Sequence, residues 1–155
     1  MCTGPLPSLQ YLLVGPDSTT EAVEDAAPWP CLLHLACENS AVTRMDASLA
    51  LLPAVQILNL SRACIDAVEH AERCVRLDCL NLSFNRFRCV RSLPTRLGAV
   101  RRLVLRGNEL ESTVGLERLY ALEGIDLASN LIICALPPAL RRTPRWRTSR
   151  LSGIH

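Results

Sequence analysis

Residues 77–87 read LDCLNLSFNRF, and four further stretches of the chain repeat the same spacing of apolar residues. The shared pattern is L-x-x-L-x-L-x-x-N-x-L, in which L stands for an apolar residue and x for a variable one. The other copies are LLHLACENSAV at 32–42, VQILNLSRACI at 55–65, VRRLVLRGNEL at 100–110 and LEGIDLASNLI at 122–132. They begin at alternating intervals of 23 and 22 residues, so the chain is built by stacking copies of one small unit.

This pattern is the signature of the leucine-rich repeat. Apolar residues at positions 4 and 6, with mostly polar or small ones at 3, 5 and 7, are typical of a short strand buried on one face. A repeat of this length leaves room for only a brief helix or 3₁₀ turn on its other side. The sequence therefore predicts an open, right-handed α/β solenoid, with parallel strands on its concave face and short helices or 3₁₀ turns on its convex face.

The composition divides the chain into three parts. The repeats, which start near 32, 55, 77, 100 and 122, predict a domain over 29–140. Residues 1–28 hold four acids and no base and are predicted to be a flexible acidic tail, with at most a short strand or helix at 9–14. Residues 141–155 hold five Arg and no acid and are predicted to be a basic disordered tail. Because no capping helix follows residue 133, we expect the chain to be a fragment of a longer protein.

Bulk properties exclude several classes of function. A formal net charge of +2 argues against nucleic acid or a membrane as an obligatory partner, and no apolar stretch is long enough to span a bilayer. The eight cysteines form no Cys-x-x-Cys motif, which favours thiols in a reducing, cytoplasmic compartment. Cys31, His34 and Cys37 have the spacing of metal ligands, but strand alternation sends His34 and Cys37 to opposite faces. We expect no metal, no cofactor and no catalytic residue, and hence no enzyme.

Two sets of residues are predicted to have specific roles. Asn85, Asn108 and Asn130 occupy position 9, where a short amide can satisfy backbone groups in the turn after the strand, whereas Ser40 and Ala63 replace it in the first two copies. The N-terminal repeats should therefore be less regular and less stable. On the concave face, we expect protein partners, in particular acidic peptide segments, to bind at Asp78, Arg101, Arg102, Arg106, Glu123 and Asp126.

The amino-acid sequence of the repeats resembles that of a known family. VTRMD at 42–46 and, above all, LPTRLGAVRRLVLRGNELESTVGLERLYALEGIDLASNLI at 93–132 are similar to the nischarin-like leucine-rich repeat proteins, a group with a tumour-suppressor-kinase-interacting member. The resemblance covers 29–132. It implies a cytoplasmic or endosome-associated signalling scaffold, with a phosphoinositide-binding PX domain before the repeats and with integrin tails, Rac and effector kinases as partners. No PX-like stretch occurs in these residues, so we expect endosomal association only through regions outside them.

Two other interpretations stay open at this point. Phosphatase-regulatory and RNA-processing solenoids share the repeat class, although they would require a different set of concave residues and a sealed C-terminal cap. A secreted recognition protein would use the glycosylation motifs NLS at Asn59 and Asn81.

Overall fold

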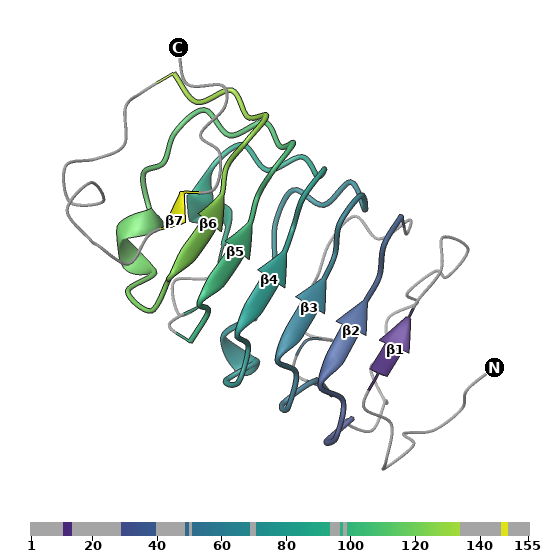
Figure 1. The fold of residues 1–155 in the computed structure, drawn as a ribbon. Helices are drawn as coiled ribbons and strands as arrows, with labels where there is room; N and C mark the ends of the chain where they lie inside the picture. Colours follow the sequence, from purple (N-terminus) through teal and green to yellow (C-terminus); the bar gives the residue numbers. More distant parts are fainter. Residues whose placement is uncertain are drawn as a thin grey trace.

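The computed structural model describes residues 11–13, 29–39, 49, 51–68, 71–93, 97, 99–133 and 147–148, the first and last of these by their backbone. In this part of the chain, seven short strands form one parallel sheet in chain order (Figure 1). They are β1 (Tyr11–Leu13), β2 (His34–Ala36), β3 (Ile57–Asn59), β4 (Cys79–Asn81), β5 (Arg102–Val104), β6 (Gly124–Asp126) and β7 (Arg147–Thr148).

The register of the sheet follows the repeat without slippage. Leu35 pairs with Leu58, and the same position is carried onward through Leu80, Leu103 and Ile125. Strands β1 to β6 have only three residues each, yet backbone bonds between neighbouring repeats continue beyond β2 to β6 on both sides. For example, the Asp78 N–H donates to the Gln56 carbonyl before the strand, and the Arg62 N–H donates to the Ser83 carbonyl after it. These bonds fix the position of every repeat on the next one.

The core is a stack of equivalent apolar positions. Position 4 is buried in β2 to β6, and so are positions 1 and 6 of the same repeats. Position 11 is filled by Ile65, Phe87, Leu110 and Ile132, all buried. Because a one-residue slip would turn every one of these side chains to the solvent, the period-2 pattern fixes which face of the sheet is open.

Opposite the strands, the chain returns through 3₁₀ turns: η2 (Ala71–Arg73), η3 (Val90–Ser92) and η4 (Leu116–Arg118). Their apolar residues, Ala71, Val90 and Leu116, are buried against the back of the sheet. The predicted fold class, an open leucine-rich solenoid with parallel strands on the concave face and 3₁₀ turns on the convex face, is confirmed.

The sheet extends past the five predicted repeats at both edges. Tyr11–Leu13 pairs with β2 at an offset of 23 residues, which is the repeat interval, and this offset aligns LQYLLVGPD at 9–17 with the repeat pattern, Asp17 standing for the Asn. A short strand or helix was predicted at 9–14, and β1 is a strand within that range, but the stretch was not predicted to be a further copy of the repeat. β7 pairs with β6 although 145–151 lacks the pattern. The predicted flexibility of 1–28 and 141–155 concerns residues that lie largely outside the described part.

Candidate protein-interaction surface

A row of charged side chains crosses the sheet just before β4, β5 and β6. The Arg101 guanidinium lies 3.5 Å from the Asp78 carboxylate and 3.8 Å from that of Glu123. All three side chains are largely exposed, so water screens the two pairs and each contributes about 0–1 kcal/mol. One arginine shared by two carboxylates leaves this end of the strands with a small negative excess.

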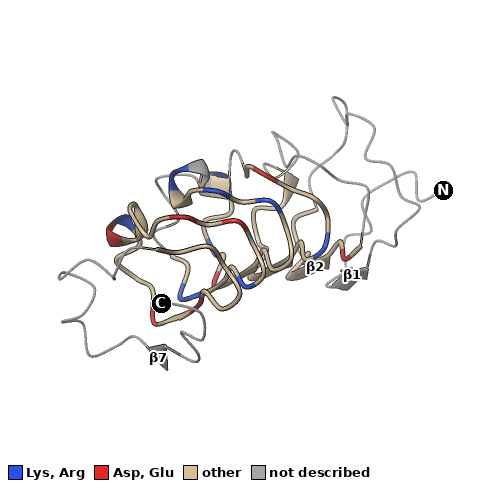
Figure 2. Ribbon diagram, turned by 90° about the horizontal axis from the view of Figure 1, so that it is seen from above, with Lys and Arg blue, Asp and Glu red and all other residues tan. Residues whose placement is uncertain are grey.

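Arg102 and Arg106, the other two arginines of the same repeat, are placed differently. Arg102 is exposed on β5, opposite Gly124 of β6, and a Cβ atom at Gly124 would meet no atom within 4 Å. Arg106 is half-buried, two residues after the strand. Neither arginine forms an ion pair with another residue in the part of the chain that the structure describes. Figure 2 shows basic and acidic segments interspersed along this solenoid, so the positive excess at Arg102 and Arg106 is local.

Asp126, the last residue of the predicted binding set, has a local structural contact. Its carboxylate accepts the Ala128 N–H at 3.0 Å, which closes the turn that follows β6. Asn81 does the same two repeats earlier, accepting the Ser83 N–H at 3.0 Å, and Asn59 accepts the Ser61 N–H at 3.2 Å. A short side-chain carbonyl at position 5 therefore stabilises the strand exit, a role visible in the sequence only as repeated Asn or Asp.

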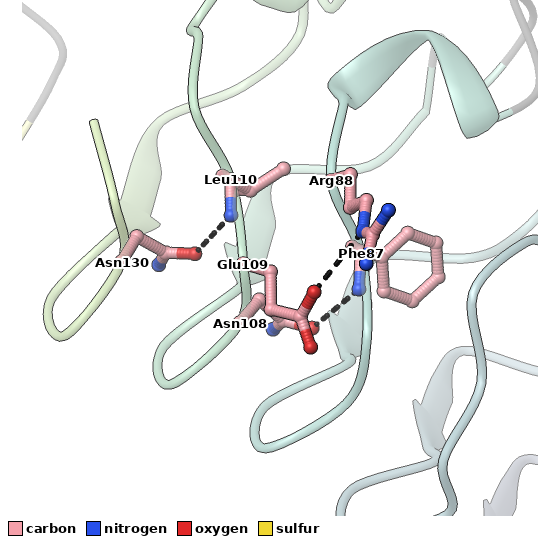
Figure 3. Close-up of polar contacts among 6 residues, drawn as sticks. All are labelled: Phe87, Arg88, Asn108, Glu109, Leu110 and Asn130. Atoms are coloured by element: carbon pink, nitrogen blue, oxygen red, sulfur yellow. Dashed lines mark hydrogen bonds and ion pairs between the residues drawn. The ribbon is translucent and has the colours of Figure 1, made fainter. Parts of the chain in front are cut away.

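The position-9 asparagines tie each repeat to the one before it (Figure 3). The Asn108 amide nitrogen donates to the carbonyls of Leu82 and Leu105, both at 2.9 Å, and its oxygen accepts the Phe87 N–H at 3.1 Å. Asn130 repeats these contacts one repeat later and accepts the Leu110 N–H. Asn85 accepts the N–H groups of two residues in the preceding repeat, at 2.8 and 3.1 Å. Each amide, buried at Asn85 and Asn108 and half-buried at Asn130, thus satisfies several backbone groups at once.

Position 8 of the five repeats that begin at 32, 55, 77, 100 and 122 takes a left-handed backbone conformation that was not predicted from the sequence. The residues there all have φ between 52° and 68°: Asn39, Arg62, Phe84, Gly107 and Ser129. Asn and Gly accept this left-handed region readily, whereas a bulky Phe seldom does. Asn and Gly are the only residues here that indicate a positive φ from the sequence, and they occupy position 8 in only two of these five repeats.

Similarity to solved structures matches this geometry. A leucine-rich repeat protein of Leptospira interrogans superimposes with a TM-score of 0.64 at 21% identity, over 88% of this chain and 41% of that one. An internalin C2 of Listeria monocytogenes superimposes with a TM-score of 0.63 at 14% identity, over 80% of this chain and 62% of that one. This chain has the leucine-rich repeat fold.

One curated relative is more similar in sequence. The human serine/threonine-protein kinase 11-interacting protein is 37% identical to this leucine-rich repeat protein over 131 residues. The aligned region is 84% of this chain but 12% of the human protein, so the chain spans a small part of that relative's length. No protein-family model matches the chain.

The described residues offer no support for a metal site, a reactive cysteine on the concave face or a membrane-spanning helix. Among the described residues of this leucine-rich repeat protein, no group of three or more His, Cys, Asp or Glu could hold a metal ion. Cys79 lies on the concave face as a free thiol, and burial raises its pKa, which disfavours the reactive thiolate. No helix in the described ranges is long and apolar enough to cross a membrane.

Proposed function

We propose that this chain is the protein-interaction module of a nischarin-like signalling scaffold, and that an acidic segment of its partner binds on the concave face at Arg102 and Arg106. The leucine-rich fold and the likeness to a kinase-interacting protein support a role in binding proteins. On this proposal the module has no enzymatic activity, and its partners are of the integrin, Rac and effector-kinase type.

The observation that carries the proposal is the pair of arginines without a described ionic partner beside an open stretch of sheet. An arginine presents a planar fork of donors that matches a carboxylate, and two such groups on one face can hold an acidic peptide in a defined position. The missing side chain at Gly124 leaves space beside Arg102. The charge row of Asp78, Arg101 and Glu123 borders the Arg102 side of this site, at the end of the strands away from Arg106, and its carboxylates repel an acidic segment and set its position.

A cytoplasmic location of the module is also a proposal. Cys31, Cys64 and Cys79 are free thiols, as expected in a reducing compartment. The alternative of a secreted recognition protein gains no support from the two NLS motifs, because the side chains of Asn59 and Asn81 close the turns after their own strands.

The test compares the proteins captured from a cell lysate by the full chain and by three variants. Arg102→Glu with Arg106→Glu should lose the captured proteins while circular dichroism stays unchanged, because neither arginine belongs to the core. Arg73→Glu with Arg118→Glu changes the charge equally on the convex 3₁₀ turns and should capture the same proteins as the parent. Deletion of 141–155 removes β7 from the edge of the sheet, but it should also leave capture intact, because Arg102 and Arg106 belong to the repeat of β5. Retention of all partners by the concave-face variant would place the binding site elsewhere.

A further inference from the structure

We propose that Phe84, flanked by Arg62 and Arg106, is the anchor point of this surface and takes up an apolar side chain from an acidic protein segment. This inference rests on the proposed function, because it specifies where on the concave face, and through which chemistry, the partner is held. The three residues lie at the exits of β3, β4 and β5, so they line one end of the strands.

The first observation is an aromatic residue held in a conformation that it seldom adopts. Phe84 has φ 56°, and the equivalent positions in the neighbouring repeats to its C-terminal side hold Gly107 and Ser129, which are smaller. Burial of the ring does not account for the Phe, since 46% of the residue is exposed to solvent. The turn imposes the positive φ in all five repeats, so what the fold does not require is a bulky, half-exposed Phe at this position, and its presence points to a role on the surface.

The second observation is that the neighbouring repeats hold the ring in place. A Cβ atom at Gly107 would lie 2.5 Å from the nearest ring carbon of Phe84, so the ring occupies the space that any side chain there would need. From the preceding repeat, the Arg62 guanidinium carbon lies 5.0 Å from the ring centroid, within the range of a cation–π contact. A ring fixed before binding loses little conformational freedom when a partner packs on it.

The third observation is the charge around the ring. The Phe84 N–H donates to the Arg106 carbonyl at 2.7 Å, which places Arg106 directly beside it in the next repeat. Like Arg106, Arg62 forms no ion pair with a described residue. The acid that comes closest in repeat position, Glu38 of the first repeat, accepts a hydrogen bond from the Asn59 side-chain amide. Glu109, further along the turn, is paired with Arg88 at 3.1 Å. A ring between two arginines is the composition typical of interface hot spots.

These features select the occupant. An apolar side chain can cover the exposed part of the ring, and flanking carboxylates can pair with Arg62 and Arg106. Arginine and an aromatic ring could also stack on the bases of single-stranded nucleic acid. However, Asp78, Glu123 and Asp126 lie on the same face and would repel the unbroken row of charges of a phosphate backbone, whereas a peptide can place its few carboxylates beside Arg62 and Arg106 alone. The surface therefore fits an acidic peptide better than a polyanion.

The test uses fluorescein-labelled synthetic peptides with the full chain, and binding is read by fluorescence anisotropy. The probe is a short peptide of Asp, Glu and Ser with Leu at its centre, and its matched control has Ala there. We expect the Leu peptide to bind more tightly than the Ala peptide, and both to weaken as salt is added. Phe84→Ser introduces the residue type that Ser129 has at the same position in the repeat of β6. This variant should bind the Leu peptide about tenfold more weakly and no more tightly than the Ala peptide.

Two further variants make the result specific. Phe84→Tyr keeps a ring and should bind the Leu peptide as the parent does. Tyr120→Ser removes an aromatic residue that is 84% exposed at the opposite end of the strands, and it should not affect binding. If Phe84→Ser binds like the parent while the Arg102→Glu, Arg106→Glu variant does not, the anchor is wrong but the concave acidic-peptide site stands. The inference is overturned if no acidic peptide binds the parent. It is also overturned if an oligouridylate binds more tightly than the peptides and its binding requires Phe84. The lysate capture experiment tests the proposed function separately.

Discussion

At the scale of single residues, the turn that leaves each strand imposes the most specific demand. Position 8 adopts a positive φ in the five repeats that begin at 32, 55, 77, 100 and 122, and from Asn39 to Gly107 its N–H donates to the next repeat, as the Gly107 N–H does to the Ala128 carbonyl at 2.9 Å. Any side chain can be placed there, but at a cost that grows with its size and branching. The sequence therefore varies at this position while the backbone does not.

Gly107→Ala should destabilise the protein by about 1 kcal/mol from its φ of 68° alone, and by more because its new Cβ displaces the Phe84 ring. In a Phe84→Ala background the ring is gone and only the backbone contribution should remain. Denaturant melts of the two single variants and the double variant measure the difference. An equal loss in both backgrounds would mean that the ring moves aside freely.

Asn108→Ala should cost about 1–3 kcal/mol, because it leaves the buried Phe87 N–H without its acceptor and removes the hydrogen bonds that Asn108 donates to the Leu82 and Leu105 carbonyls. Glu109→Ala, one residue further along the chain, is the matched control. It removes only the exposed pair with Arg88 and should cost about 0–1 kcal/mol. Chemical melts compare the two, and an Asn108→Ala variant as stable as the parent would show that the amide is dispensable.

At the scale of the element, three-residue strands are held by their neighbours and not by their own length. Isolated strands this short have no stability, but each one here pairs on both sides from β2 to β6. The inward side chain at the middle of each strand then packs between two equivalent ones. Stability of an element is thus a property of the stack.

Leu103→Ala should destabilise the domain by about 2–5 kcal/mol, because Leu103 is fully buried between Leu80 and Ile125. Val104→Ala, the next residue, faces the open side of the sheet and should cost far less. Equilibrium unfolding of both variants tests the phase of the strand directly. Equal losses would indicate that Val104 contributes to a packed interface rather than to an open face.

At the scale of the whole molecule, each repeat contacts only its neighbours, so the two ends of the solenoid can open independently. The asparagine contacts connect the repeats from Ala63 onward, since Asn85 reaches back to the Ala63 and Ile65 N–H groups. Position 9 holds Ala63 and Ser40 in the two repeats before Asn85, so no amide there reaches back in the same way. The N-terminal side is therefore expected to open first.

Cys37 gives a local probe of this opening. Burial raises the pKa of its thiol to about 11, so at pH 8 it should resist alkylation in the folded protein, whereas the exposed Cys31 and Cys64 should react. On local unfolding the pKa falls to its ordinary value and the thiolate fraction rises. Mass spectrometry across a denaturant series should detect Cys37 alkylation before the transition seen by circular dichroism. Coincident transitions would show that the repeats unfold as one unit.

Much of this architecture could be read from the sequence, because apolar spacing alone decides which side chains face inward. The phases at Leu58, Leu80 and Leu103 predicted the strands, their parallel pairing and the open face. The copy at 9–17 escaped notice because Asp17 replaces the Asn and an acidic, proline-containing stretch follows. The pairing of β1 with β2 shows that this stretch is a copy of the repeat, at the same interval of 23 residues that occurs later in the chain.

Only the tertiary structure shows which residues about 20 positions apart contact each other. The sequence predicted that Arg101, Arg102 and Arg106 lie on one face. It did not show that Asp78 and Glu123 both pair with Arg101, or that Arg102 and Arg106 lie outside this charge row. It gave no sign that Phe84 adopts a positive φ or that its ring lies where a side chain of Gly107 would be. Periodicity fixes the direction of a side chain, whereas its partners depend on the close approach of neighbouring repeats, and that distance exists only in the folded stack.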